Sequence, residues 1–208
     1  MKTWLLVSLG AILLTPLQAQ EDHKVIVDVG AGFTTPVGST GNALDTGWNI
    51  RGGVGYNFSS VVGAMIQVDY NSLGISSNTL SNLGFPGGDV HVFSATLDPI
   101  VHLTPHRHFD LYLIGGGGMY RRTEEFTQPG VASVVGYNPF FGFYNYGVPT
   151  TNILASYTVI KPGVNGGMGI GLGSKWGGKF YAEARYHRIF MNNNYHTDYV
   201  PVTFGFRW

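Results

Sequence analysis

The chain has 208 residues, which corresponds to one domain or at most two small ones. Charged residues make up 12% of it, about half the usual ~25%, whereas glycine, with 31 residues, is roughly twice as frequent as average. The 12 basic and 12 acidic residues cancel, so no basic excess indicates a nucleic-acid partner. The aromatic content of 14% excludes a disordered chain, and the lack of cysteine excludes a disulfide scaffold and thiolate chemistry.

The first 19 residues predict a cleaved secretory signal peptide. Lys2 gives a basic start, and the apolar run of residues 4–14 is shorter than the ~18 residues that a membrane-spanning helix needs. Small and polar residues follow, with a predicted cleavage site after Ala19. An uncleaved anchor helix is the less favoured alternative. We therefore assign residues 1–19 to a signal peptide and residues 20–208 to one exported domain.

The rest of the chain alternates with a period of two residues, which is the pattern of half-buried β-strands. The last segment shows it most clearly, since its apolar side chains all share one face: Val200, Val202, Phe204, Phe206 and Trp208. The opposite face carries small or polar residues, including Thr203 and Arg207. Seven further segments of this kind are expected, near residues 25–33, 48–58, 62–70, 90–103, 109–122, 154–172 and 180–187. The phase of the two glycine-rich segments, 109–122 and 154–172, stays open.

Short and long connections alternate between these eight predicted strands. The short ones are residues 57–61, 104–109 and 173–178, and the long ones are 34–46, 71–88, 123–153 and 191–198. Transmembrane barrels have short periplasmic turns and long outer loops, and an even strand number places both termini in the periplasm. The pattern therefore predicts an all-β fold, an eight-stranded antiparallel up-and-down transmembrane β-barrel. Pro99 predicts a bulge near the membrane edge, because proline cannot donate to the ladder.

Charged residues fall on the face opposite to the apolar one, which places them inside a closed barrel. A soluble lipocalin-like barrel would bury the apolar face instead, so this alternative is rejected. Eight strands enclose an interior that side chains fill, and buried charges there must pair. We therefore predict a lumen filled by polar side chains, although a gated path of small conductance through it remains an alternative. The predicted lumen network is Asp28, Arg51, Asp69, Glu183, Arg185, His187 and Arg207.

The residues of the last two predicted strands resemble those of small eight-stranded outer-membrane barrels, the OmpA-like and OmpX-like group. The segment 202–208 is similar to the carboxy-terminal aromatic signal of that family, and residues 180–186 are similar to its penultimate strand. The resemblance implies that Phe204, Phe206 and Trp208 are read by the barrel-assembly machinery. Because the chain stops at Trp208, we expect no peptidoglycan-binding domain of the kind that follows the barrel in full-length OmpA-type proteins.

No catalytic, cofactor or metal site is predicted from the sequence. His106 and His108 flank an arginine in a short turn, but a defined metal site needs three or four ligands. The glycine run 115–118 lacks the lysine and hydroxyl residue of a phosphate-binding loop. Such glycines in a strand indicate tight curvature or close backbone approach.

The predicted loop of residues 126–151 is the most distinctive segment. Loops of this length are usually functional or disordered. Its aromatics form either a surface for a partner or lipopolysaccharide, or an extension of the aromatic girdle where the hairpin protrudes from the barrel. The predicted extracellular aromatic loop residues are Tyr137, Phe140, Phe141, Phe143, Tyr144 and Tyr146.

The sequence favours a non-enzymatic, monomeric outer-membrane protein with an envelope-structural or adhesive role through its outer loops. Expected partners are outer-membrane lipid, lipopolysaccharide and the barrel-assembly machinery, with no nucleic acid. Two alternatives stay open, a narrow conduit for small molecules and a lipid-A-modifying enzyme. The enzyme would need a nucleophile and base in reach, for which His91 with Ser94, or His196 with Asp198, are the candidates.

Overall fold

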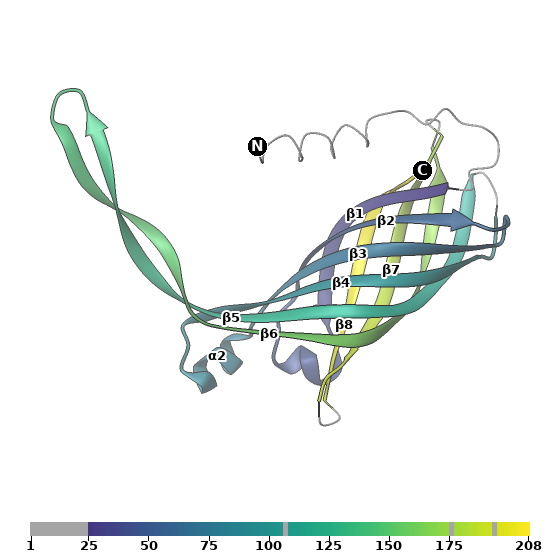
Figure 1. Cartoon of the computed structure of the whole chain (residues 1–208), viewed down its shortest axis with the longest axis horizontal. Helices are drawn as coiled ribbons and strands as arrows, with labels where there is room; N and C mark the ends of the chain where they lie inside the picture. Colours follow the sequence, from purple (N-terminus) through teal and green to yellow (C-terminus); the bar gives the residue numbers. More distant parts are fainter. Residues whose placement is uncertain (1–24, 106–107, 175–176, 193–194) are drawn as a thin grey trace.

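The structure is a computed structural model that describes residues 25–105, 108–174, 177–192 and 195–208. The predicted signal peptide therefore lies outside the described residues. Eight antiparallel strands form a closed barrel in which each strand pairs with the next and β8 pairs with β1 (Figure 1). The strands are β1 (Val25–Pro36), β2 (Gly47–Asn57), β3 (Val62–Gly74), β4 (Gly87–His102), β5 (Phe109–Asn138), β6 (Gly142–Gly173), β7 (Lys179–Phe190) and β8 (His196–Arg207). The predicted eight-stranded barrel is confirmed.

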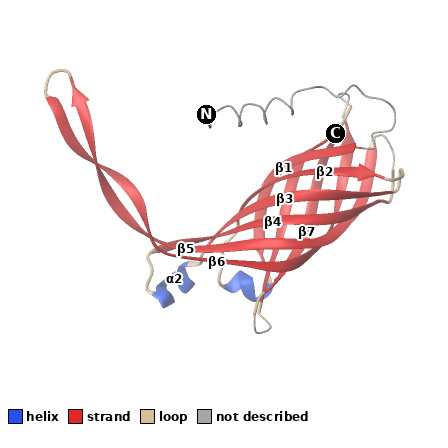
Figure 2. Cartoon of the chain, viewed as in Figure 1, coloured by secondary structure: helices blue, strands red, loops and turns tan. Residues whose placement is uncertain are grey.

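Two short helices lie at the end of the barrel from which β5 and β6 extend (Figure 2). The 3-10 helix η1 (Gly38–Asn42) connects β1 to β2, and α2 (Ser77–Leu83) connects β3 to β4. The predicted connections 34–46 and 71–88 are therefore partly ordered, and 191–198 is shorter than expected because β8 begins at His196. In the described part of the chain, no helix is long and apolar enough to cross a membrane.

Along each barrel strand, successive side chains point in turn to the outer and the inner face of the barrel. On β2, Trp48 and Ile50 are half exposed on the outside, whereas Asn49 and Arg51 between them are buried inside. The two glycine-rich strands now have a phase: Tyr112 and Tyr120 of β5 point inward, as does Asn165 of β6. An apolar outer surface surrounds a core that carries charge, which is the reverse of a soluble protein.

The predicted bulge at Pro99 is wrong. The register between β3 and β4 runs unchanged through the pair of Ala64 and Pro99. Between β4 and β5, the pairing pauses after Leu97 and resumes at Ile100 in the same register. Proline removes a hydrogen-bond donor from the ladder, but an intact register needs no extra residue.

The predicted loop 123–153 is not a loop but the outer half of a long hairpin. β5 and β6 stay paired up to Asn138 and Gly142, far beyond the last β4 contact at Thr127. At ~3.4 Å per residue, the eleven residues beyond Thr127 carry the tip roughly 37 Å past the end of β4 (Figure 1). A register shift at Phe126 and Thr127 makes Leu154 an extra residue on β6, and such a bulge bends and twists a hairpin.

Candidate functional site

Two features of the fold are candidates for function: the buried network inside the barrel and the protruding β5–β6 hairpin. The structure places all seven residues of the predicted lumen network on the inner face, each at most 7% exposed. The six predicted aromatic residues lie at or near the tip of the hairpin. The hairpin projects beyond the end of the barrel, whereas the network lies inside it (Figure 1).

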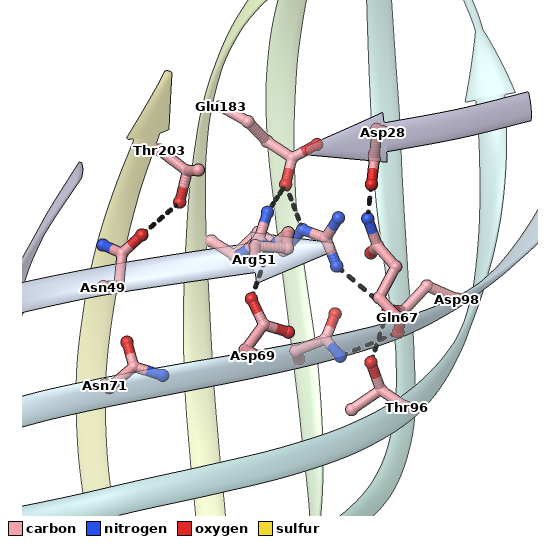
Figure 3. A network of polar contacts seen from close by, with 12 residues as sticks. Asp28, Asn49, Arg51, Gln67, Asp69, Asn71, Thr96, Asp98, Glu183 and Thr203 are labelled. Atoms are coloured by element: carbon pink, nitrogen blue, oxygen red, sulfur yellow. Dashed lines mark hydrogen bonds and ion pairs between the residues drawn. The ribbon is translucent and has the colours of Figure 1, made fainter. Parts of the chain in front are cut away.

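Glu183 is the centre of the lumen network. It forms ion pairs with Arg51 and Arg185, and its other oxygen accepts a hydrogen bond of 2.9 Å from the hydroxyl of Tyr112. Arg207 approaches the same carboxylate at 3.6 Å. Three arginines thus surround one glutamate, and each has a second acidic partner: Asp69 for Arg51, Asp98 for Arg185 and Asp28 for Arg207. Figure 3 shows Arg51 between Glu183 and Asp69.

Asp98 was missing from the predicted network, although the alternation of its strand placed it inside. Its carboxylate lies 3.0 Å from Arg185 and accepts hydrogen bonds from Thr96 at 2.6 Å and Asn165 at 2.8 Å. Three arginines are therefore matched by four carboxylates, all buried and all paired.

The remaining polar residues extend this network with hydrogen bonds. Gln67 donates to Asp28 at 3.1 Å, and Thr203 donates to Asn49 in a separate chain (Figure 3). This chain continues from Asn49 to Thr34 and from Thr34 to Asn71. Uncharged polar residues on inner faces carried the same alternation signal as the charges. The alternation predicts their inward position, but only the structure shows that they bond to one another.

His187 lies inside the barrel but outside the ion-pair network. Its Nδ1 is 3.1 Å from the hydroxyl of Tyr120, and its ring stacks on Tyr199 with a centroid distance of 5.0 Å. Tyr120 and Tyr199 belong to a buried apolar cluster at the hairpin end of the lumen. The other members of that cluster are Leu44, Leu73, Ile75, Val90, Val92 and Ile189.

A second apolar cluster occupies the opposite end of the lumen. It consists of Ile26, Met65, Ile100, Tyr112 and Ile114. The predicted lumen filled by polar side chains is therefore wrong in part, because the polar network lies between two apolar layers. Sequence alternation identifies inward positions but not that the apolar ones gather at the two ends.

The enzyme candidates do not assemble into a nucleophile with its base. His91 lies on the outer face of β4 and contacts the hydroxyl of Tyr70 at 3.0 Å, whereas Ser94 is buried on the inner face. His196 does lie 3.2 Å from Asp198, but that carboxylate is held by Arg188 at 2.9 Å. Among the described residues, no cluster of three His, Asp or Glu could hold a metal ion, and His106 lies outside them.

The hairpin carries its aromatics on both faces. Tyr137 faces Phe143 across the strands with ring centroids 5.1 Å apart, while Tyr144 and Tyr146 share the other face at 5.7 Å. The turn between the strands exposes most of Phe140 and Phe141, 90% and 84% respectively. The aromatic rings at the tip are largely exposed, so among the described residues no barrel strand covers the aromatic surface of the hairpin.

The last strand shows the same division of faces. Phe206 packs against Phe180 and Trp208 on the outside, with centroid distances of 4.9 and 4.8 Å. Phe204 is also on the outer face and is 54% exposed. Trp208 closes the barrel, since its backbone N–H donates to Val27 at 2.8 Å and its carbonyl accepts from Val27 at 3.2 Å.

A closed barrel with an apolar exterior and a charged, fully paired interior is an arrangement for a lipid surrounding. The sequence matches the outer membrane protein beta-barrel domain family over residues 4–207. The chain belongs to this family. Its predicted resemblance to small eight-stranded outer-membrane barrels is thereby confirmed, and the outer membrane is its location.

Solved structures of other outer-membrane barrels share this fold. Neisserial surface protein A is 17% identical with a TM-score of 0.55, covering 88% of this chain and 96% of that one. Ail, the attachment invasion locus protein of Yersinia pestis, solved with the heparin analogue sucrose octasulfate, is 16% identical with a TM-score of 0.47, covering 88% and 97%. The outer membrane protease OmpT of Escherichia coli is 11% identical with a TM-score of 0.44, covering 93% and 99%.

At 17% identity, the similarity to Neisserial surface protein A establishes the fold alone. No curated protein matches the chain. The function of this outer-membrane barrel must therefore be argued from its own residues.

The two apolar layers of the lumen predict a barrel that does not conduct ions. A permeating ion would have to cross two apolar layers and break an ion-pair network that eight strands leave no room to bypass. We expect the purified protein to show no steady openings in a planar lipid bilayer. The control is a large porin inserted under identical conditions, and long-lived openings of uniform size from this chain would contradict the layered lumen.

Proposed function

We propose that this chain is a non-enzymatic integral outer-membrane protein that binds a surface partner through its β5–β6 hairpin. The observation that carries the proposal is the hairpin itself, whose aromatic tip reaches roughly 37 Å past β4 and is covered by none of the residues that the structure describes. A large exposed apolar patch on a folded protein marks an interaction site. The ion-paired side chains of the lumen support this role, because they make the barrel a rigid base for the hairpin rather than a reaction centre.

The proposed orientation follows from the connections. The β2–β3 turn and both described ends of the chain, Val25 and Trp208, lie at the end opposite to the hairpin. Short turns face the periplasm in outer-membrane barrels, and long outer connections face the medium. In this orientation both termini are periplasmic and the hairpin projects from the cell. Assembly through the aromatic face of β8 and contact of the outer surface with lipopolysaccharide belong to the same proposal.

The two alternative functions have less support. A lipid-A-modifying enzyme would need a serine and a histidine on one face, and His91 and Ser94 lie on opposite faces of β4. A conduit would need a continuous polar path, and the lumen places an apolar cluster at each end of its polar network. The hairpin is the feature that neither alternative uses.

Removing the hairpin tests the proposal without disturbing the barrel. Thr127 and Ile153 face each other across the two strands, so a two-residue Asn-Gly turn can join them and replace residues 128–152. We expect cells that produce the intact chain to attach to polystyrene and to one another, and cells with the shortened chain to lose this attachment. The measurement is retention of cells under flow together with their rate of aggregation.

The control is the amount of folded barrel in the outer-membrane fraction, judged by its altered migration in unheated gel samples. Both chains should be present at equal levels and fold equally well. If the shortened chain supports attachment as well as the intact one, the hairpin is not the binding surface. If neither chain raises attachment above that of cells without the gene, the adhesive role is wrong.

A further inference from the structure

The tip of the hairpin has the chemistry of a membrane-inserting surface. We propose that Phe140, Phe141 and Phe143 insert into the outer leaflet of a second lipid bilayer that faces the cell. This inference rests on the proposed function and names its partner, a lipid surface.

The outer part of the hairpin is uncharged, which suits contact with hydrocarbon. Residues 126–160 contain no Asp, Glu, Lys, Arg or His, in a chain where charged residues elsewhere form ion pairs. A single charge would oppose entry into an apolar phase, because an isolated charge is very costly to bury. A hairpin that binds a protein partner by charge complementarity would instead carry a cluster of charged residues of one sign. The neutral tip therefore fits an uncharged occupant.

The aromatic side chains are ordered by polarity along the hairpin, with phenylalanine at the tip and tyrosine behind it. Phe140 and Phe141 stand at the turn, 90% and 84% exposed. Behind them come the tyrosines 137, 144 and 146, and behind these Ser133 and Thr150 stand among exposed valines such as Val131. Aromatic rings with a polar end lie at the boundary between lipid and water, with apolar groups deeper. The gradient of this hairpin follows the gradient of a bilayer entered from the tip.

The backbone of the turn permits shallow entry and opposes deep entry. Pro139 has no N–H, and the N–H of Phe140 donates to the side-chain oxygen of Asn138 at 2.8 Å. The tip thus exposes few unpaired donors. Further back, the outer edge of each strand pairs with no third strand, and such edges are costly in hydrocarbon. Insertion should therefore stop at the depth of an interfacial segment, about 5–10 Å.

A second copy of the chain fits the tip less well than a bilayer does. A stable protein interface buries about 800 Å² on each partner. Three phenylalanine side chains supply roughly 450–750 Å² even when fully buried. A bilayer needs neither that area nor a matching shape. A dimer through the tip is an outcome that the experiment below detects.

The test uses the full mature chain in phosphatidylcholine nanodiscs, mixed with protein-free phosphatidylcholine vesicles that float in a density gradient. We expect the nanodiscs to float with the vesicles, and salt up to about 1 M to leave the binding unchanged, because screening acts only on charges. The variant Phe140→Ser/Phe141→Ser should bind about tenfold less or weaker still, since each lost phenylalanine removes a large apolar area.

The matched control is Val131→Ser/Val135→Ser on the shaft of the same hairpin. These valines are also exposed, at 76% and 64%, but lie behind the tip. Their replacement should leave the vesicle binding within about twofold, as exposed substitutions away from the contact usually do. Equal loss in both variants would show general hydrophobic adhesion and would overturn the tip insertion.

A probe locates the tip directly. The chain contains no cysteine, so Asn145→Cys, exposed beside the tip, accepts a fluorophore at one position. Brominated lipid placed only in the vesicles should quench it. Quenching only by brominated lipid in the nanodisc would mean that the hairpin folds onto its own membrane, and paired nanodiscs without vesicles would mean a dimer. Either result overturns the inference.

The two proposals can fail separately. If nanodiscs do not bind vesicles while cells still need the hairpin for attachment, the lipid partner is wrong and the surface-binding function stands. If cells do not need the hairpin but nanodiscs bind vesicles through Phe140 and Phe141, the adhesive function is wrong and the tip inserts without serving attachment.

Discussion

Replacing Arg185 by methionine is expected to destabilise the barrel by about 3–5 kcal/mol, the usual result of removing one partner of a buried ion pair. Arg185 is fully buried and pairs with both Asp98 and Glu183. Glu183 keeps Arg51 and Arg207 in the variant, but Asp98 keeps only the neutral donors Thr96 and Asn165. The loss is measured as the shift in the urea midpoint for unfolding from lipid vesicles.

Two further variants test the cause of that loss. Arg188→Met on the same strand removes an arginine that also pairs with an aspartate, Asp198, but whose side chain is 40% exposed, so its effect should be much smaller. Arg185→Met with Asp98→Asn removes both charges of one pair and should recover most of the stability. If the double variant is as unstable as the single one, lost packing and not an unpaired carboxylate is the cause.

Gly167→Ala is expected to destabilise the barrel strongly, whereas Gly166→Ala one residue earlier should leave its stability unchanged or slightly raised. A methyl group on Gly167 would lie 2.1 Å from the backbone oxygen of Ala184 and 2.6 Å from the Cα of Arg185, so β6 and β7 would have to separate. Forcing such a backbone shift costs typically about 1–3 kcal/mol. A methyl group on Gly166 meets nothing within 4 Å.

The measurement is again unfolding from lipid vesicles by urea, with both variants compared with the parent chain. A gain of a few tenths to about 1 kcal/mol at Gly166 would reflect a less flexible unfolded chain. The contrast separates close strand approach from general glycine flexibility, because both residues lie on the same strand. Equal effects at the two positions would show that tight approach on the inner face does not explain the glycine content.

The hairpin shows why one large element could not be predicted from the sequence. Strands of the barrel alternate because lipid contacts one face and the packed lumen contacts the other. Beyond Thr127 both faces of β5 and β6 meet the same surroundings, so no period of two residues arises. Turn-forming residues such as Pro129, Gly130 and Pro149 then made the segment resemble a loop. Pairing between distant strands decided its structure.

The lumen shows the same division between local and long-range information. The inward position of Glu183 follows from its neighbours, because a two-residue period sets the face of every residue in a strand. Its partners Arg51 and Arg207 come from strands far apart in the chain, and only the closed ring brings the three together. The two apolar layers are likewise assembled from residues of several strands.

Low charge, high glycine and abundant aromatics thus have separate physical origins. The sequence by itself determined the fold, the lipid surrounding and the faces of every strand except the two glycine-rich ones, since burial on one side leaves a periodic signal in neighbouring residues. Only the tertiary structure decided which charges pair, where the lumen is closed and that residues 126–151 form a projecting hairpin. These three features depend on contacts between residues that are remote in sequence, and local periodicity carries no information about such contacts.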